Sequence, residues 1–219
     1  MIILFSLLNI LQAVKMNPVK YFENMPVSVP EQLILMRMGY KKGKTEIDAE
    51  QNIKIKAGIQ KGSSLCVLKT AYLILKIISN DGNKIVLENE LKLESVQLAK
   101  LLGTATEAVL MAATTGAEVV RVRDEEIQSG DAVLGVIIDA TASETADAGL
   151  DAVQDLISKT LIRTGKKLTR RYSPGYGDLN LSEQKKIHET LALTKIGIDI
   201  NNRYILSPEK SVLAIAGVE

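Results

Sequence analysis

The sequence predicts an α+β fold, with a mainly antiparallel sheet and flanking helices. An apolar run at 64–79, the turn "NDGN" at 80–83 and an alternating run at 84–94 together indicate a β-hairpin. Helical stretches interleave irregularly with such hairpins, which favours an α+β arrangement. The longest helical pattern, at 132–166, is apolar enough in its first half to be a central core helix.

The first half of the chain predicts two more helices. Residues 47–62 have the spacing of an amphipathic helix that ends at Gly62. A short helix follows the hairpin, with Ser95 as its N-terminal cap and Gly103 as its stop. The stretch "AVLMAATTG" at 108–116 is either a buried strand or a tight small-residue segment.

The second half predicts a charged helix at 117–131, and the long helix is then expected to stop at Gly165. A further helix at 181–193 follows Asn180, whose side chain is expected to cap it. The rest of the chain is apolar in short stretches. We expect three short strands there, at 196–200, 203–207 and 211–217.

Composition narrows the function classes. The 219 residues suffice for one domain or for two small lobes that share a core. A formal net charge of +1 argues against a general nucleic-acid binder, which would carry a strong basic excess. Aromatic residues make up 4% of the chain, so the core is expected to be aliphatic and stacking platforms for bases are not expected.

Cys66 is the only cysteine and His188 the only histidine. One cysteine excludes an intrachain disulfide and fits a reducing compartment, so we expect a cytoplasmic protein. Zinc and iron–sulfur sites need several Cys or His ligands, which this chain alone does not provide. Cys66 lies in an apolar run and is expected to be a buried, inert thiol, whereas His188 is expected on a helix surface.

The N-terminus, "MIILFSLLNILQAVKM", is apolar but shorter than the roughly 20 residues that span a membrane, so no membrane segment is expected. Its leucines fall at helical spacing and predict a packed helix. An equally favoured alternative is a start assigned too early, with Met16 as the true first residue. A cleaved signal is less favoured, because a basic n-region and a clear cleavage site are missing. We therefore divide the chain into an N-terminal extension, 1–30, and a domain, 31–219.

The sequence lacks three familiar catalytic or nucleotide-binding motifs. "GYKKGKT" at 39–45 has three residues between its glycines where a phosphate loop needs four, so we interpret it as a solvated turn. "GYG" at 175–177 lacks the third glycine of a dinucleotide-binding loop. No Gly-x-Ser-x-Gly occurs, and a single histidine leaves little scope for a serine triad.

The stretch "RRYSPGYGD" at 170–178 has a composition suited to a ligand. Pro174-Gly175 sets a turn, and the glycine lets a ligand approach the backbone. Arg171 offers a planar fork for a carboxylate, and Tyr176 offers a ring or a hydroxyl. Such a set suits a small zwitterion with a flat ring system. The residues alone favour the plainer interpretation, in which Pro-Gly ends a strand and Arg171 is a surface residue.

A resemblance to a known family favours the ligand-binding interpretation of this stretch instead. "RRYSPGYGDLNLSEQKK" resembles the Arg-x-x-x-Gly-Tyr segment of the activation (S-adenosylmethionine-binding) domain of cobalamin-dependent methionine synthase, in its free-standing form. "VIIDATASETADAGLDAVQDLI" resembles the helix before that motif, and "SPEKSVLAIAGV" resembles the closing strand. The resemblance covers residues 105–219 well. "LILMRMGYKKG" at 33–43 is a weaker echo, and the first 30 residues match nothing in the family.

The resemblance implies an S-adenosylmethionine site without a Rossmann glycine loop. Arg171 would hold the methionine carboxylate, and the backbone from Ser173 to Tyr176 would line the adenosine side. The family places a glutamate on the preceding helix, and Asp155 matches it with a shorter side chain. A second family contact, an N-terminal aspartate, has no match here. The implied ligand-binding residues are Asp155, Arg171, Ser173, Pro174, Gly175 and Tyr176.

The resemblance also implies the chemistry, which belongs to methionine biosynthesis or to anaerobic methyl transfer. In the family, an inactive Co(II) corrinoid takes up one electron, and S-adenosylmethionine methylates the Co(I) that forms. His188 lacks the Asp-x-His-x-x-Gly setting of a cobalt ligand, so a partner would carry the cobalamin. That partner would be a corrinoid protein or a cobalamin-dependent methyltransferase. This chain has no ligand set for the zinc that activates homocysteine and would not be a complete methionine synthase.

Five of the nine residues in "RTGKKLTRR" at 163–171 are Lys or Arg. A solvated face is the plainer interpretation of this cluster. The functional one is docking of an acidic electron donor, such as a flavodoxin or a ferredoxin, by electrostatic steering. An alternative function for the whole chain is a non-catalytic adaptor that docks a corrinoid methyltransferase without binding the methyl donor.

Overall fold

The computed structural model describes residues 17–219, and within them six strands form one antiparallel sheet. These strands are β1 (Lys20–Phe22), β2 (Lys69–Asn80), β3 (Lys84–Leu87), β4 (Lys92–Glu94), β5 (Glu107–Thr114) and β8 (Ser211–Val218). Their order is β4-β3-β2-β5-β8. β1 and β3 pair with the same edge of β2: β1 lies beside the first residues of β2, and β3 lies beside its last residues. β8 therefore lies at one edge of the sheet, and this edge builds the site described below.

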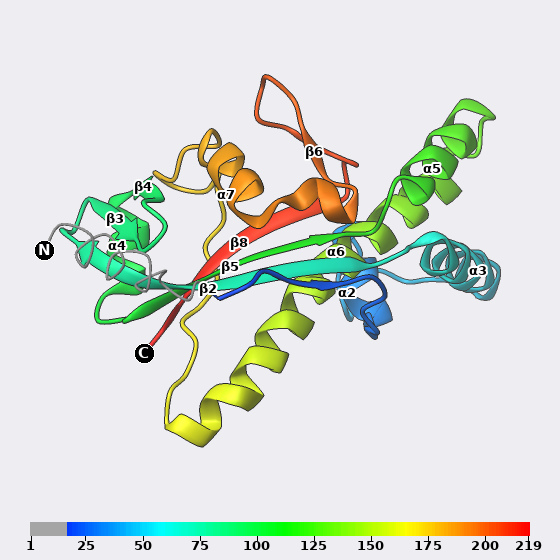
Figure 1. Cartoon of the computed structure of the whole chain (residues 1–219). Coiled ribbons are helices and arrows are strands. Elements are labelled where there is room, and N and C mark those ends of the chain that lie inside the picture. Colours follow the sequence, from blue (N-terminus) through cyan, green and yellow to red (C-terminus); the bar gives the residue numbers. More distant parts are fainter. Residues whose placement is uncertain (1–16) are drawn as a thin grey trace, which may run out of the picture.

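Helices cover both faces of the sheet (Figure 1). The helices of the described residues are α2 (Glu31–Arg37), α3 (Ala49–Leu65), α4 (Val96–Leu102), α5 (Glu118–Gln128), α6 (Ala132–Leu161) and α7 (Glu183–Leu191). α6 crosses one face, whereas α4 and α7 pack on the other. A small hairpin of β6 (Asp199–Ile200) and β7 (Leu206–Ser207) lies beside α7.

β5 is buried on both faces because it is central in the sheet and has helices above and below. Its side chains alternate between two cores: Val109 and Met111 pack with α6, whereas Leu110 and Ala112 pack on the α4 and α7 side. α6 comes close to the sheet at Gly149, where an added Cβ would lie 3.0 Å from the Cβ of Ala113. A small residue at 149 is therefore required for this contact.

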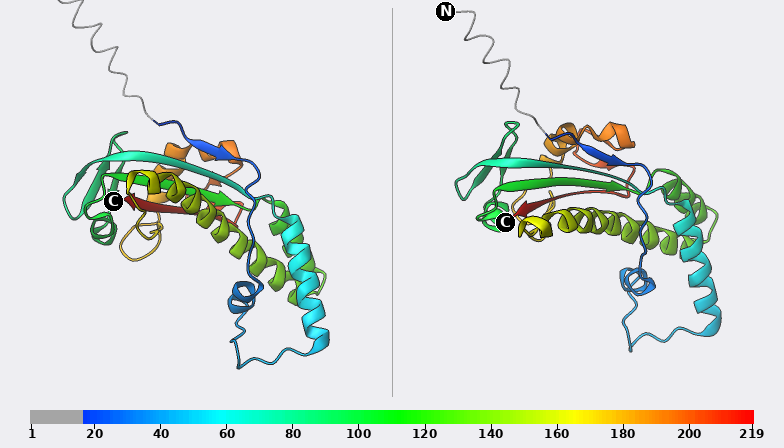
Figure 2. Two further views of the ribbon diagram at one scale, coloured as in Figure 1. Left: turned by 90° about the horizontal axis from the view of Figure 1, so that it is seen from below. Right: turned by 60° about the horizontal axis from the view of Figure 1, so that its bottom comes forward.

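The first half of α6 extends past the sheet and forms a helical arm with α2, α3 and α5 (Figure 2). Glycines on α3 allow a close approach to α6: a Cβ at Gly58 would lie 2.8 Å from the Ile137 side chain, and one at Gly62 would lie 3.0 Å from Thr141. Arg37 on α2 bonds to α6 and so holds this helix against the same arm. The arm brings the segment before α2 alongside α6.

The predicted fold class is confirmed, and several local predictions hold. β2 and β3 form an antiparallel hairpin, and its turn is closed by the Asp81 carboxylate, which accepts from two backbone N–H groups. Ser95 caps α4 by accepting from the Leu98 N–H, and Gly103 ends that helix. The 3₁₀ turn after α6 ends at Gly165, with a φ of +69°.

Other boundaries differ for physical reasons. α3 does not stop at Gly62 but continues to Leu65, because that glycine serves close helix packing. The run at 84–94 forms two strands, since Glu90 adopts a positive φ in a turn between them. α7 begins at Glu183, and Asn180 bonds to the Ser182 N–H in the turn that precedes the helix. The sequence predicts three strands near the C-terminus. The last, β8, has eight residues, whereas β6 and β7 have two residues each.

The N-terminal predictions lie partly outside the described residues. The helix expected from the leucine spacing and the start at Met16 fall on residues 1–16, which are outside them. Within the expected extension 1–30, β1 pairs with β2 and is part of the sheet. Among residues 17–219, no helix has both the length and the apolar character to cross a membrane.

Candidate functional site

The loop at 173–178 owes its shape to two glycines after Pro174. Both adopt a positive φ, +90° at Gly175 and +53° at Gly177, which side chains other than glycine rarely allow. A Cβ at Gly177 would also collide with the Tyr172 hydroxyl and the side-chain amide of Gln97. The sequence therefore fixes this loop closely against α4.

Asp178 fastens the end of the loop to α4. Its carboxylate accepts a hydrogen bond from the Ser95 hydroxyl at 2.5 Å and others from the N–H groups of Val96 at 2.7 Å and Gln97 at 3.2 Å. The bond from Ser95 is the largest cause that holds the pKa of Asp178 below its usual value. Ser95 also caps α4, so the loop and the helix share one anchor.

The segment 166–172 runs along the outer edge of β8 and then leaves it. Tyr172 exchanges two backbone hydrogen bonds of 2.8 Å with Ile215. Alternate residues of a strand direct their backbone groups to the same edge, so the N–H and C=O of Leu213 face this edge as well. No described residue bonds to those two groups, because the chain turns away after Tyr172. Leu213 is 2% exposed, and buried backbone groups without partners are rare, so this edge offers a donor and an acceptor to a ligand.

A cavity of about 350 Å³ lies between this edge, the loop, α6 and α7. It is lined by four of the residues predicted from the sequence: Arg171, Ser173, Pro174 and Tyr176. Gly175 sits in the same turn but does not line the cavity. Tyr176 is 69% exposed, which places its ring at the rim. The other lining residues are Asp147, Leu150, Tyr172, Gln184, Ser211, Val212 and Leu213.

Arg171 and Asp147 give the cavity a charged end. Nη1 of Arg171 lies 2.7 Å from the Asp151 carboxylate and 3.5 Å from the backbone carbonyl of Asp147. The Asp147 carboxylate lies 2.9 Å from Nη2 of Arg37, which also pairs with Glu144. Burial is the largest influence on the pKa of Asp147, and it raises that pKa despite the two arginines. A guanidinium and a carboxylate side by side suit a ligand that carries both charges.

Asp155 lies outside this cavity. It is eight residues beyond Asp147 on α6, about 12 Å along the helix axis. It lines a neighbouring hollow of about 410 Å³ between α6 and residues 26–33, a hollow that Asp147 also borders. Asp155 and Arg171 therefore line different hollows, and the structure does not place this acid and this arginine in one cavity. The acidic side chain that shares the cavity with Arg171 is Asp147.

The architecture is shared, over almost the whole chain, with a solved structure of a known domain. It is a crystal structure of the MetH reactivation domain bound to AdoHcy, with a TM-score of 0.69 over 93% of this chain and 79% of that one, at 13% sequence identity. This chain has the fold of the MetH reactivation domain. No protein-family model matches the sequence, and no curated protein sequence matches it.

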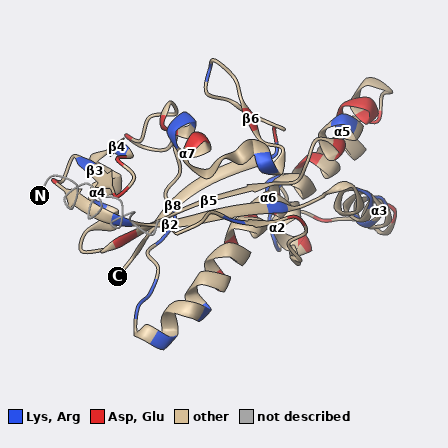
Figure 3. Cartoon of the chain, viewed as in Figure 1, with Lys and Arg blue, Asp and Glu red and all other residues tan. Residues whose placement is uncertain are grey.

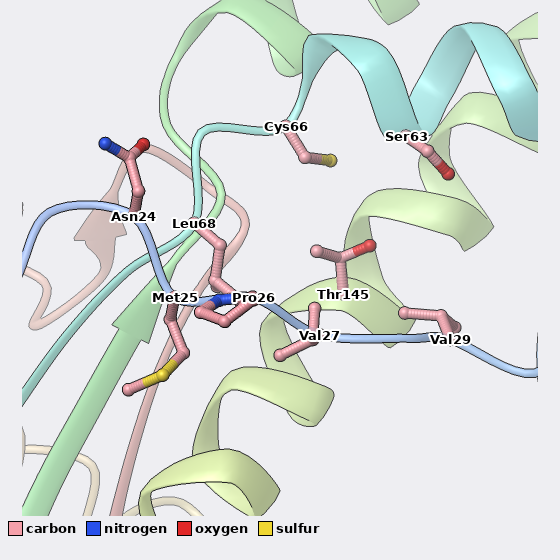
Figure 4. A pocket seen from close by; sticks show the side chains of 9 residues that line it. All are labelled: Asn24, Met25, Pro26, Val27, Val29, Ser63, Cys66, Leu68 and Thr145. Atoms are coloured by element: carbon pink, nitrogen blue, oxygen red, sulfur yellow. The ribbon is translucent and has the colours of Figure 1, made fainter.

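Within the reactivation-domain fold, the single histidine, His188, and the single cysteine, Cys66, lie away from the cavity. His188 is buried, and its predicted place on a helix surface is wrong, because α7 turns that side chain inward to donate from Nε2 to the Ile198 carbonyl at 2.8 Å. Cys66 borders another hollow, of about 360 Å³, beside Thr145 (Figure 4). Burial raises the pKa of Cys66 to about 11, so the thiol stays protonated at neutral pH, as an inert thiol should.

The basic cluster at 163–171 is largely paired in the reactivation-domain fold. Lys166 lies 2.9 Å from Glu107, and Lys167 lies 3.1 Å from Glu219. Arg163 and Arg170 have no carboxylate partner among residues 17–219 and are exposed. Figure 3 shows Lys and Arg gathered at the C-terminal end of α6 and along the segment that follows it. Among all the described residues, 17–219, no group of three or more His, Cys, Asp or Glu is placed to hold a metal ion.

Sequence reasoning missed three parts of the cavity. Asp147 shares the helical pattern of Asp151 and Asp155, but only the crossing of α6 over the sheet selects which of these acids lines the cavity. Gln184 is an ordinary polar residue of α7 in the sequence. The free edge at Leu213 exists because a distant segment stops pairing with β8, which no local pattern reveals.

Proposed function

We propose that this chain binds S-adenosylmethionine in the cavity beside Arg171 and delivers its methyl group to the cobalt of a corrinoid held by a separate protein. The observation that carries the proposal is the convergence of Arg171, Asp147 and the free β8 edge on one cavity. Support comes from the fold, because the MetH reactivation domain was crystallised with AdoHcy. AdoHcy is what remains of S-adenosylmethionine once the methyl group has left. We place this work in the cytoplasm.

The ligand would be held at its amino-acid end by charge. Arg171 would exchange its bond with Asp151 for the ligand carboxylate, and Asp147 would face the ammonium group. Asp155 stays a prediction for the ammonium contact, but it borders the neighbouring hollow, and we favour Asp147. The volume of the cavity falls within the range of small-molecule sites.

The adenosine end would be held by neutral groups. The N–H and C=O of Leu213 can bond to a purine edge as a neighbouring strand would. The turn from Ser173 through Pro174 and Gly175 would follow the ribose, since the missing Cβ at the glycine permits a close approach. The exposed ring of Tyr176 at the rim would cover one face of the ligand.

The chain would act by positioning. An external donor reduces Co(II) on the partner to Co(I) with one electron. The Co(I) electron pair attacks the sulfonium methyl carbon, the carbon–sulfur bond breaks, and methyl-cobalt and AdoHcy are formed. Proteins contribute to such a step by aligning the reacting groups. An open rim beside Tyr176 is what a partner needs to bring its cobalt close.

The reductant would be a flavodoxin or a ferredoxin that docks on the two exposed arginines, Arg163 and Arg170. Charge steering of this kind is weakened by salt. We expect reactivation to slow about tenfold between 50 and 300 mM NaCl, whereas ligand affinity changes less than about twofold. The two salt dependences are measured by a stopped-flow assay and by calorimetry. Equal slopes would exclude this docking surface.

A non-catalytic adaptor remains the second candidate, because Arg171 already pairs with Asp151 at 2.7 Å. An arginine that keeps this partner would not bind a carboxylate. Such a chain would dock a corrinoid methyltransferase without binding the methyl donor. Ligand binding by the free chain distinguishes the two functions.

The test of the main proposal is a reactivation assay. A cobalamin-dependent methyltransferase without its own reactivation domain is prepared in the Co(II) form and mixed with reductant, S-adenosylmethionine and this chain. We expect methylcobalamin, followed by absorbance, and AdoHcy in a one-to-one ratio. Both products should be lost in Arg171→Ala but kept in Lys185→Ala, because Lys185 is exposed and lies outside the cavity and the basic cluster. Methylation at the same rate without this chain would contradict the proposal.

A further inference from the structure

Gln184 is a polar side chain with a fixed orientation inside the cavity. It comes from the first turn of α7, is 9% exposed and lines the cavity opposite α6. Its Nε2 donates a 2.6 Å hydrogen bond to the backbone carbonyl of Tyr204. A carbonyl only accepts hydrogen bonds, so the amide nitrogen must face Tyr204 and Oε1 must face away from it.

The carbonyl that orients Gln184 is itself held rigidly by the turn between β6 and β7. The N–H of Tyr204 donates to the carbonyl of Asn201 at 2.9 Å. The side chain of Asn201 accepts from Arg203 and Ile205, at 2.8 and 3.0 Å. These bonds hold Tyr204 at a φ of +63°. The direction of the Gln184 amide is therefore set by the fold and does not depend on a ligand.

The cavity has two ends of different character. Arg171 and Asp147, on the α6 side, carry full charges. Gln184 and Ser211, on the α7 side, are neutral, and the free backbone edge of Leu213 lies between. A zwitterion with a nucleobase would place its charged groups at the first end and its base at the second, because an unpaired buried charge is far more costly than an unpaired amide.

Oε1 of Gln184 has no hydrogen-bond partner among the described residues. Gln184 lines the cavity, so a ligand that displaces water from Oε1 must supply a donor in its place. The 6-amino group of adenine is a donor, whereas the 6-oxo group of hypoxanthine or guanine is an acceptor. Opposed acceptors in a buried site leave both oxygens unsatisfied.

We propose that Gln184 determines base specificity by accepting a hydrogen bond from the exocyclic amino group of adenine, so that the site rejects 6-oxo purines. This inference rests on the proposed function, since it concerns the same ligand. It adds a residue from α7 and a supporting hairpin, β6–β7, which the Arg-x-x-x-Gly-Tyr segment does not include.

The test compares AdoHcy with S-inosylhomocysteine, which differs only at position 6 and in the proton on N1. Both are titrated into the full chain by calorimetry, for the wild type and for Gln184→Leu and Gln184→Glu. The wild type should prefer AdoHcy by at least about tenfold, or about 1.4 kcal/mol. Gln184→Leu should reduce the preference to within about threefold. Gln184→Glu should bind both ligands more weakly, because one carboxylate oxygen then opposes the Tyr204 carbonyl, but the other oxygen still accepts and the preference for AdoHcy should be retained.

The affinity ratio is the readout because general damage to the fold weakens both ligands together. Lys185→Ala, an exposed neighbour on the same helix, serves as the matched control and should keep the wild-type ratio. Equal binding of both ligands by the wild type would overturn this inference and leave the proposed function intact. An unchanged ratio in Gln184→Leu would also overturn it. Binding of neither ligand would overturn both proposals.

Discussion

Two hollows border the acidic face of α6, and they differ in what the rest of the fold adds to that face. The cavity by the loop at 173–178 adds a guanidinium, a free strand edge and a buried amide. The neighbouring hollow adds the mostly apolar segment 26–33. Asp147 borders both, whereas Asp155 borders only the second. An acid on this helix would therefore gain a binding role from the groups that face it.

The largest expected effect is that of Arg171→Ala. Removal of the fork that would hold the ligand carboxylate should weaken S-adenosylmethionine binding about 100-fold, or about 2.7 kcal/mol. Arg170→Ala is the matched control, because that arginine precedes Arg171 in the chain but lies outside the cavity. Its affinity should stay within about twofold of the wild type. Calorimetry gives both values, and equal losses in the two variants would exclude Arg171 as the residue that holds the ligand carboxylate.

Asp147→Asn and Asp155→Asn test which of the two hollows binds the ligand. Loss of the charge opposite the ligand ammonium should weaken binding about tenfold to thirtyfold in Asp147→Asn. Asp155→Asn should change it less than about twofold, since Asp155 does not line the cavity. The same titrations measure both variants. A reversed order would restore Asp155 as the acidic ligand residue.

Asp178→Ala examines how far the loop depends on its anchor at α4. The change removes the acceptor for Ser95 and for two backbone N–H groups, so the loop should be less well ordered. We expect a lower free energy of unfolding and a fall of about fivefold in ligand affinity. Urea unfolding and calorimetry measure the two quantities. Unchanged affinity in a destabilised variant would mean that the anchor does not shape the cavity.

The smallest effect concerns pH. Burial raises the pKa of Asp147, so this group takes up a proton at a higher pH than an ordinary aspartate. The ligand ammonium needs the ionised form, and affinity should therefore fall as the pH drops through that raised pKa. Asp155→Asn should follow the same curve, and Asp147→Asn should be nearly flat. Identical curves for all three proteins would exclude Asp147 as the titrating contact.

The same shift has a consequence for stability. A carboxyl group with a raised pKa in the folded state favours folding while it is protonated, and this contribution is lost as the pH rises through that pKa. At neutral pH the ionised Asp147 therefore opposes folding of the free protein. Such a cost is common where a group is kept for binding.

The sequence predicted those parts of the fold that depend on local patterns. The hairpin after residue 80, the cap at Ser95 and the long helix before Gly165 follow from turn chemistry, capping and periodicity. A glycine can end a helix or allow two helices to touch, and only the packing of α3 on α6 shows that Gly62 does the second. The burial of His188 depends on how α7 meets the core, which the sequence of α7 alone does not reveal.

The site could be predicted in part for the same reason. Arg171 and the turn through Tyr176 are close in sequence, and the structure brings them to one cavity with Ser173 and Pro174. Asp147 and Gln184 come from helices on opposite faces of the sheet, and their meeting depends on the register of each helix. The resemblance implies Asp155 as the acid, whereas Asp147 lines the cavity, because α6 carries several acids at similar spacing.

The most direct measurement is a crystal structure of this chain with AdoHcy. We expect the ligand in the cavity beside β8, with its carboxylate on Arg171, its ammonium group beside Asp147 and its base against the Leu213 backbone. In that complex the bond between Arg171 and Asp151 should be open. A ligand bound in the hollow at residues 26–33, or an Arg171 that remains paired with Asp151 at full ligand occupancy, would contradict the central claim.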